Sequence, residues 1–264
     1  MLSGITIVCF AASYTVTLAL EVSRLLLRAG ARVAVMLGFA AAGLVAHTLH
    51  LFAMQARSGA GWYVWCLVAA WVLAAIYLGL ALRRPRTATG LFLLPVVLAL
   101  VGAARLVGDG EPFARGSDYQ PWVTIHGVAL LLGTIVVLLG FVAGVMYLVQ
   151  SYRLKHKLPP RQGFQLPSLE WLQRVNSRSL VISSCLVVAG LISGIVLNRL
   201  KQGSQAGSLV WTSGILLAWL AAAMLFEYLY KPARQGRKVA YLTVASFVFL
   251  GIVLVMVLLS GHAT

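Results

Sequence analysis

The chain alternates long apolar runs with short polar segments. A run of about 20 apolar residues is the length that a helix needs to cross roughly 30 Å of hydrocarbon. Such runs lie near residues 4–27, 31–55, 61–82, 90–107, 122–150, 177–199, 208–230 and 239–260. The pattern therefore predicts an all-α fold, a polytopic membrane helical bundle of about eight transmembrane helices that forms a single domain over residues 1–264.

The composition agrees with this pattern. Apolar residues make up 61% of the chain and charged residues 10%, whereas soluble domains carry roughly a quarter charged residues. The first run lacks a basic start and continues to Leu27, so we expect a retained span rather than a cleaved signal peptide. Cys9, Cys66 and Cys185 each lie in an apolar run without a CxxC motif, which predicts small packing residues.

The positive charges alternate between the two sides of the predicted bundle. The net charge is +15, and 16 of the 21 basic residues fall in every second loop. The positive-inside rule makes these loops cytoplasmic, with both termini outside, in a multi-pass protein of the inner (plasma) membrane. Nucleic acid is not an expected partner, because no basic stripe with interleaved aromatic residues is present.

Two of the loops are longer than the others. One is an outer loop near 108–121, and the other is a cytoplasmic loop near 151–176. In the second loop, Leu169, Leu172 and Val175 recur at helical spacing, which predicts a short amphipathic helix along the inner surface.

Four of the five histidines are expected in or near the outer leaflet. They are His47 and His50 in the second span, His126 at the start of the fifth and His262 after the eighth, whereas His156 lies in a basic cytoplasmic loop. Ionisable residues inside a membrane suggest function, and imidazole is a common axial ligand of haem iron.

Two imidazoles at matching depth on different spans can hold a haem between them, and His126 with His262 meets that requirement. His47 and His50 share roughly one face of their helix, so either can face the bundle. The alternative for each histidine is a hydrogen bond to a backbone carbonyl or to water. Zinc is less favoured, because no carboxylate or thiolate accompanies the histidines at that depth.

Several segments carry a resemblance to a known family. In chain order they are LVAHTLHLFAMQARSG with WCLVAAWVLAAIYLGL, HGVALLLGTIVVLLGFVAGVMYLVQSYRLKHK, LPSLEWL and GRKVAYLTVASFVFLGIVLVMVLLSGHAT. Together they resemble the cytochrome c assembly protein family of CcsA/HemX-like membrane proteins over residues ~35–82 and ~122–264. The resemblance implies that His126 and His262 are the external axial ligands of a b-type haem and that His47 is the family's transmembrane histidine. It also implies haem handling at the outer face during maturation of c-type cytochromes.

One segment departs from the family pattern. Members that present haem for attachment carry a tryptophan-rich outer segment. Residues 198–214, at the corresponding position here, contain a single tryptophan, Trp211. The departure points to the shorter HemX-like or YpjD-like branch, to a protein that is not a stand-alone enzyme, and to partner subunits that present the haem. Two alternatives stay open: a regulator of a haem-biosynthesis enzyme acting through the 151–176 loop, and a b-type cytochrome electron-transfer subunit of a respiratory complex. The cytochrome alternative would need a second haem, and the sequence offers no inner-leaflet histidine to bind it.

Overall fold

The computed structural model describes residues 7–24, 31–55, 61–85, 87–107, 120–157 and 164–200. Towards the C-terminus it also describes positions 215, 218, 222, 225, 240, 241, 243–248 and 251. Within these residues the chain is helical apart from short turns and one isolated bridge between Thr87 and Gln165. The predicted all-α class is thereby confirmed.

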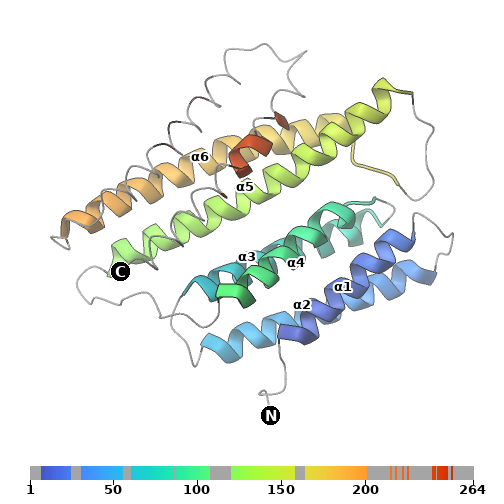
Figure 1. Ribbon diagram of the computed structural model, residues 1–264, viewed down its shortest axis with the longest axis horizontal. Coiled ribbons are helices and arrows are strands. Elements are labelled where there is room, and N and C mark those ends of the chain that lie inside the picture. Colours follow the sequence, from blue (N-terminus) through green and yellow to red (C-terminus); the bar gives the residue numbers. More distant parts are fainter. Residues whose placement is uncertain are drawn as a thin grey trace. The chain divides into compact units, whose positions relative to one another are not determined.

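Six helices follow one another along the described part of the chain (Figure 1). They are α1 (Ile7–Ser23), α2 (Ala31–Gln55), α3 (Trp62–Arg83), α4 (Gly90–Val107), α5 (Gln120–Lys155) and α6 (Leu169–Leu200). Four of them contain segments long and apolar enough to cross a membrane, and α1 and α4 are shorter apolar helices. The six correspond to the first six predicted spans. The last two predicted spans lie mostly outside the described residues, so the count of eight and the placement of both termini stay predictions.

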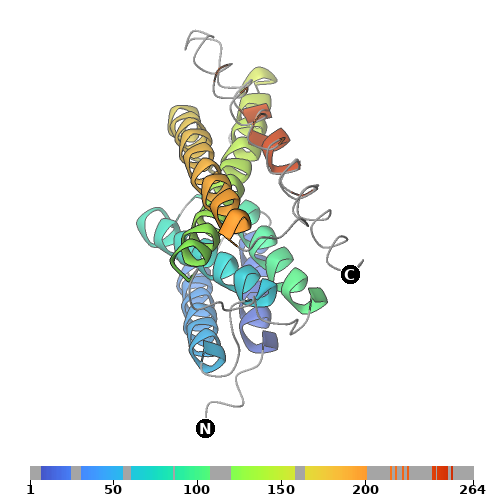
Figure 2. The ribbon, with the colours of Figure 1, turned by 90° about the vertical axis from the view of Figure 1, so that its left-hand side faces the viewer.

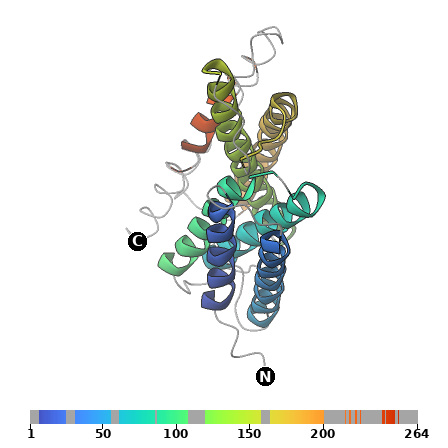
Figure 3. The same ribbon diagram turned by 90° about the vertical axis from the view of Figure 1, so that its right-hand side faces the viewer.

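The described helices fall into two compact units, each of which has its own packing. The first unit comprises residues 1–114 and 156–167. In it, α1 packs against α2 and α4, and α3 completes the ring by packing against the same two helices. Figures 2 and 3 view these four helices closer to end-on. Phe10, Leu67, Leu73 and Leu94 are fully buried between them, so most of the core of this unit is apolar.

A buried polar cluster lies at the C-terminal end of α1. The Glu21 side chain is only 1% exposed and pairs with Arg24 at 3.2 Å. The Tyr77 hydroxyl of α3 donates to the same carboxylate at 3.1 Å, and Arg24 donates to the backbone oxygen of Pro85 at 2.6 Å. A Cβ at Gly90 would lie 2.6 Å from Glu21 Oε1, so the start of α4 closes over the carboxylate. The cluster ties α1 to α3 and to the connection that follows α3.

The second unit comprises residues 115–155 and 168–264. Its main feature is the long pairing of α5 with α6, which run side by side in Figure 1. The helical residues 243–248 pack onto α5, where a Cβ at Gly144 would lie 2.6 Å from Thr243 Oγ1 and one at Gly140 would lie 3.7 Å from Thr243 Cγ2. Small residues let helices approach closely in this way.

The ends of α5 and α6 extend further than the sequence pattern predicts. Helix α5 continues to Lys155, and α6 already begins at Leu169. The amphipathic turns around Leu172 are therefore the first part of α6 rather than a separate helix. Leu172 is fully buried there, and burial of this apolar side chain stabilises turns that the sequence analysis places in the cytoplasmic loop.

Candidate functional site

His126 lies in the second turn of α5, where its ring rests on the backbone of α6. Its Nδ1 is 2.8 Å from the carbonyl oxygen of Gly190. A Cβ at Gly194 would come within 2.9 Å of the ring Cε1 and 3.1 Å of Nδ1. The imidazole is half-buried and fits against α6 because residue 194 has no side chain.

This contact decides which ring nitrogen carries the proton. A carbonyl oxygen only accepts hydrogen bonds, so Nδ1 must be the donor to Gly190. In the neutral ring, Nε2 then keeps its lone pair. Histidines that bind metals usually donate their other ring N–H to a carbonyl or carboxylate, which fixes the tautomer and the ring orientation. His126 therefore has the arrangement of a histidine that presents Nε2 to a metal ion.

His47 of α2 is fully buried in the other unit. Its ring stacks on Phe10 of α1 with centroids 4.1 Å apart and planes 2° from parallel. Its Nδ1 lies 3.2 Å from the Tyr14 hydroxyl, and its Nε2 is buried without a hydrogen-bond partner. An unpaired buried polar atom costs about 1–3 kcal/mol, so Nε2 is a second nitrogen that a ligand would satisfy.

His50 and His156 have more open surroundings. His50 is half-buried, and its Nε2 lies 3.2 Å from the Tyr63 hydroxyl. The sequence left open whether His47 or His50 faces the bundle. Because His47 is fully buried and His50 is only half-buried, His47 is the one that faces the bundle. His156 is exposed just after the end of α5.

His262 lies outside the described residues, so its pairing with His126 stays a prediction. Within the described part of the chain, no three histidine, cysteine or acidic side chains gather where they could hold a metal ion. A haem between two imidazoles needs only one nitrogen from each side, so His126 and His47 are each suited to supply one such nitrogen within their own units.

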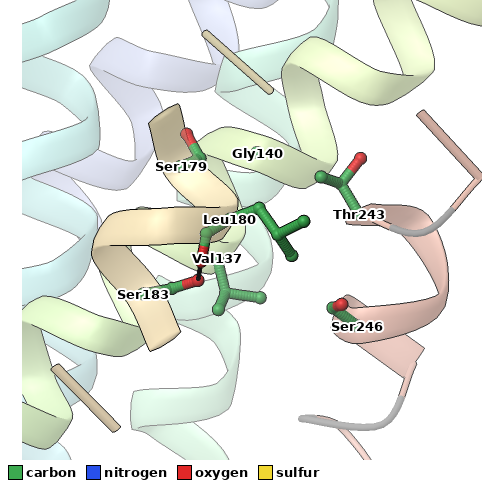
Figure 4. A pocket seen from close by; sticks show the side chains of 7 residues that line it. All are labelled: Val137, Gly140, Ser179, Leu180, Ser183, Thr243 and Ser246. Carbon is green, nitrogen blue, oxygen red and sulfur yellow. Dashed lines mark hydrogen bonds between the residues drawn. The ribbon is translucent and has the colours of Figure 1, made fainter. Parts of the chain in front are cut away.

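A small pocket opens in the second unit between α5, α6 and residues 243–248 (Figure 4). It offers about 10 Å³ of room, enough for roughly one water molecule. Its lining comprises Val137, Gly140, Ser179, Leu180, Ser183, Thr243 and Ser246. A porphyrin cannot enter a space of this size, so the pocket is separate from the histidine site.

Sequence reasoning found the histidines but not the residues that hold them. Tyr14 and Phe10 come from α1, 33 and 37 positions before His47, and only tertiary packing brings them together. The surface of α6 on which the His126 ring rests, formed by Gly190 and Gly194 and called its seat below, did leave a signal in the sequence. Residues 190–194 read GLISG, which is a GxxxG motif of the kind that lets another helix approach closely.

Comparison with known proteins adds the family. The family described as cytochrome c assembly protein matches residues 61–263, which is more than half of the 264 residues. The chain belongs to the cytochrome c assembly protein family. Searches of curated proteins and of solved structures each found no match. Family membership assigns the chain to cytochrome c biogenesis and links it to haem. Together with the apolar helices, it identifies a membrane protein.

Proposed function

We propose that this protein binds haem and handles it at the outer face of the inner membrane during cytochrome c assembly. In this proposal His126 and His262 are the axial ligands of a b-type haem, and His47 is a deeper or alternative ligand. The haem supplies the reactive iron. The chain's own residues bind it, orient it and tune it, as proteins generally do for cofactors. Other subunits of the assembly system would receive or present the haem.

The observation that carries the proposal is the hydrogen bond from His126 Nδ1 to the Gly190 carbonyl oxygen. It leaves Nε2 with a lone pair, and it holds the ring against α6. The position of His126 near the start of α5 is the position at which the family resemblance expects an external ligand. His262 is included as the second ligand on the basis of that resemblance alone.

The unpaired Nε2 of His47 supports the role of a second ligand. The hydrogen bond with Tyr14 has two possible directions, because a hydroxyl can donate or accept. When His47 Nδ1 donates to the Tyr14 oxygen, Nε2 is free to bind iron. When the tyrosine donates, Nε2 carries a proton and the histidine has a structural role. His47 is therefore the ligand whose removal most needs testing.

The test is the reduced-minus-oxidised visible spectrum of the detergent-purified protein, produced in cells well supplied with haem. Separate variants carry His126→Ala, His262→Ala and His47→Ala. We expect a b-type spectrum in the unaltered protein, and loss of most of the haem with either of the first two variants. His156→Ala is the matched control, because it removes an exposed histidine outside the predicted site and should leave the spectrum unchanged.

Two results would count against the proposal. Purified protein that stays free of haem would exclude the site and favour the regulatory alternative. A haem spectrum that survives both His126→Ala and His262→Ala, yet disappears with His47→Ala, would move the site into the first unit.

A further inference from the structure

The GLISG segment of α6 has two glycines one helical turn apart, at positions 190 and 194. Residues four apart lie on the same face of a helix, and this face carries the His126 ring. Gly190 provides the carbonyl oxygen that accepts the imidazole N–H, and Gly194 provides the space for the ring. A methyl group at 194 would lie 2.9 Å from Cε1, closer than real Cβ contacts come, so the ring would have to move.

Gly190 has a close contact of its own with α5. A Cβ at this position would lie 2.8 Å from Leu130 Cδ2. The absence of a side chain therefore lets α5 approach α6 at this level. That approach brings the ring of His126, one turn before Leu130, within hydrogen-bond distance of the Gly190 carbonyl.

Ser193 is a competing donor beside the same carbonyl. Its hydroxyl lies 2.9 Å from the oxygen of Gly190 and 2.8 Å from the oxygen of Ala189. A hydroxyl has one proton to donate, and the Ala189 oxygen can take it. The Gly190 oxygen then remains available to His126.

The opposite tautomer would be unfavourable in this seat. It would point the Nδ1 lone pair at the lone pairs of the Gly190 oxygen, 2.8 Å away, in surroundings of low dielectric where such repulsion is strong. A hydrogen bond would be replaced by two facing acceptors. The seat thus favours one of two tautomers that are close in energy in water.

We propose that Gly190 and Gly194 are positioning residues that hold His126 in the Nδ1-protonated tautomer and so make its Nε2 a metal-binding nitrogen. The identity of the metal as haem iron rests on the proposed function, but the choice of tautomer does not. Both glycines act through His126 and are not expected to touch the iron themselves.

The experiment records the ¹⁵N resonances of the His126 ring in the full-length protein without haem. In neutral imidazole the protonated nitrogen and the bare nitrogen give well-separated signals, so the tautomer is read directly. We expect Nδ1 protonated and Nε2 bare in the unaltered protein, and a mixture of tautomers in Gly194→Ala. The same samples are then titrated with iron protoporphyrin IX. We expect Gly194→Ala to bind iron protoporphyrin IX about 10- to 100-fold more weakly than the unaltered protein, which is the usual effect of losing such a supporting contact.

Two matched controls separate the seat from general packing. Gly133→Ala adds the same methyl group to α5, where the nearest atom, Leu186 Cβ, is 3.5 Å away, an ordinary contact. Ser193→Ala removes the competing donor without filling the seat. Both should keep the tautomer and the affinity of the unaltered protein.

The outcomes separate this inference from the proposed function. A proton on Nε2 in the unaltered protein, or an unchanged tautomer in Gly194→Ala, overturns the inference. The expected tautomers without any binding of iron protoporphyrin IX overturn the proposed function and leave the inference standing. If Gly194→Ala fails to fold, His126→Ala is added to free the space. Recovery of folding in the double variant supports the seat, and failure to recover overturns it.

Discussion

Tyr14 and His47 form a polar pair inside the first unit. The hydroxyl lies 3.2 Å from Nδ1, and both side chains are at most 1% exposed. The other nitrogen of the same ring already lacks a partner. Without the hydroxyl, both ring nitrogens would be buried and unpaired, and no water would have ready access to them.

Tyr14→Phe is therefore expected to destabilise the protein. The expected loss is about 1–3 kcal/mol, the usual penalty for leaving a buried polar group without a partner. Thermal unfolding of the haem-free protein in detergent measures it. Tyr63→Phe is the matched control, because it removes the hydroxyl partner of His50, whose ring is half-buried rather than fully buried. Equal stability of the two variants would contradict this account of the pair.

The role of His126 could be predicted only in part from the sequence. Its place near the start of a span followed from the order of apolar runs, and its chemistry followed from the residue type. Its acceptor is Gly190, 64 positions away, and a backbone oxygen leaves no mark in the sequence. The tautomer therefore depends on how α5 and α6 pack, and a sequence pattern could not supply it.

At the level of helices, close approach depends on where glycine is present. Gly144 of α5 faces Ala240 and Thr243, because an added Cβ would lie 2.6 Å from Thr243 Oγ1 and 3.1 Å from the backbone oxygen of Ala240. A backbone oxygen cannot move aside easily. Gly79 of α3, in contrast, has nothing within 4 Å of an added Cβ. The two glycines are chemically alike and differ in their surroundings.

Gly144→Ala is expected to destabilise the second unit by about 1–3 kcal/mol, the usual penalty for overpacking. Gly79→Ala should be neutral or stabilising by up to about 1 kcal/mol, because alanine favours the helix. Unfolding of both variants in the same detergent provides the comparison. A loss at position 79 as large as that at 144 would show that helix packing does not distinguish these glycines.

The cores of the first six predicted helices were accurate because apolar runs of about 20 residues leave few other structures in a membrane. The ends were less accurate for a physical reason. Glu170 and Arg174 lie in the predicted cytoplasmic loop near 151–176, where the sequence predicted a short separate helix before the sixth span. Helix α6 includes them because one face of these turns buries Leu172, while the charged side chains are exposed and Arg174 pairs with Glu170 at 3.0 Å.

At the level of the whole molecule, the charge pattern predicts an orientation. The chain's C-terminus should lie outside and the end of α5 in the cytoplasm. Exposed Lys155 is a suitable position for a label on the cytoplasmic side.

Single-cysteine variants test this orientation. Cys9, Cys66 and Cys185 are first replaced by serine, and Lys155→Cys or Thr264→Cys is then introduced. A membrane-impermeant thiol reagent should label Thr264→Cys in intact spheroplasts and Lys155→Cys only after permeabilisation. The reverse pattern would invert the topology and move His126 to the cytoplasmic side, where it could not serve assembly at the outer face.

The length of α5 has a consequence for the lipid around it. The helix has 36 residues, about 54 Å at 1.5 Å per residue, whereas the hydrocarbon core is only about 30 Å thick. It carries no Asp, Glu, Lys or Arg before Arg153, so no charge fixes its depth near Gln120, and we expect the helix to tilt or to extend beyond the hydrocarbon. We then expect the depth of His126 in the bilayer to vary with the length of the acyl chains. A cell that remodels its lipids thereby changes how much water reaches this imidazole without altering a single residue.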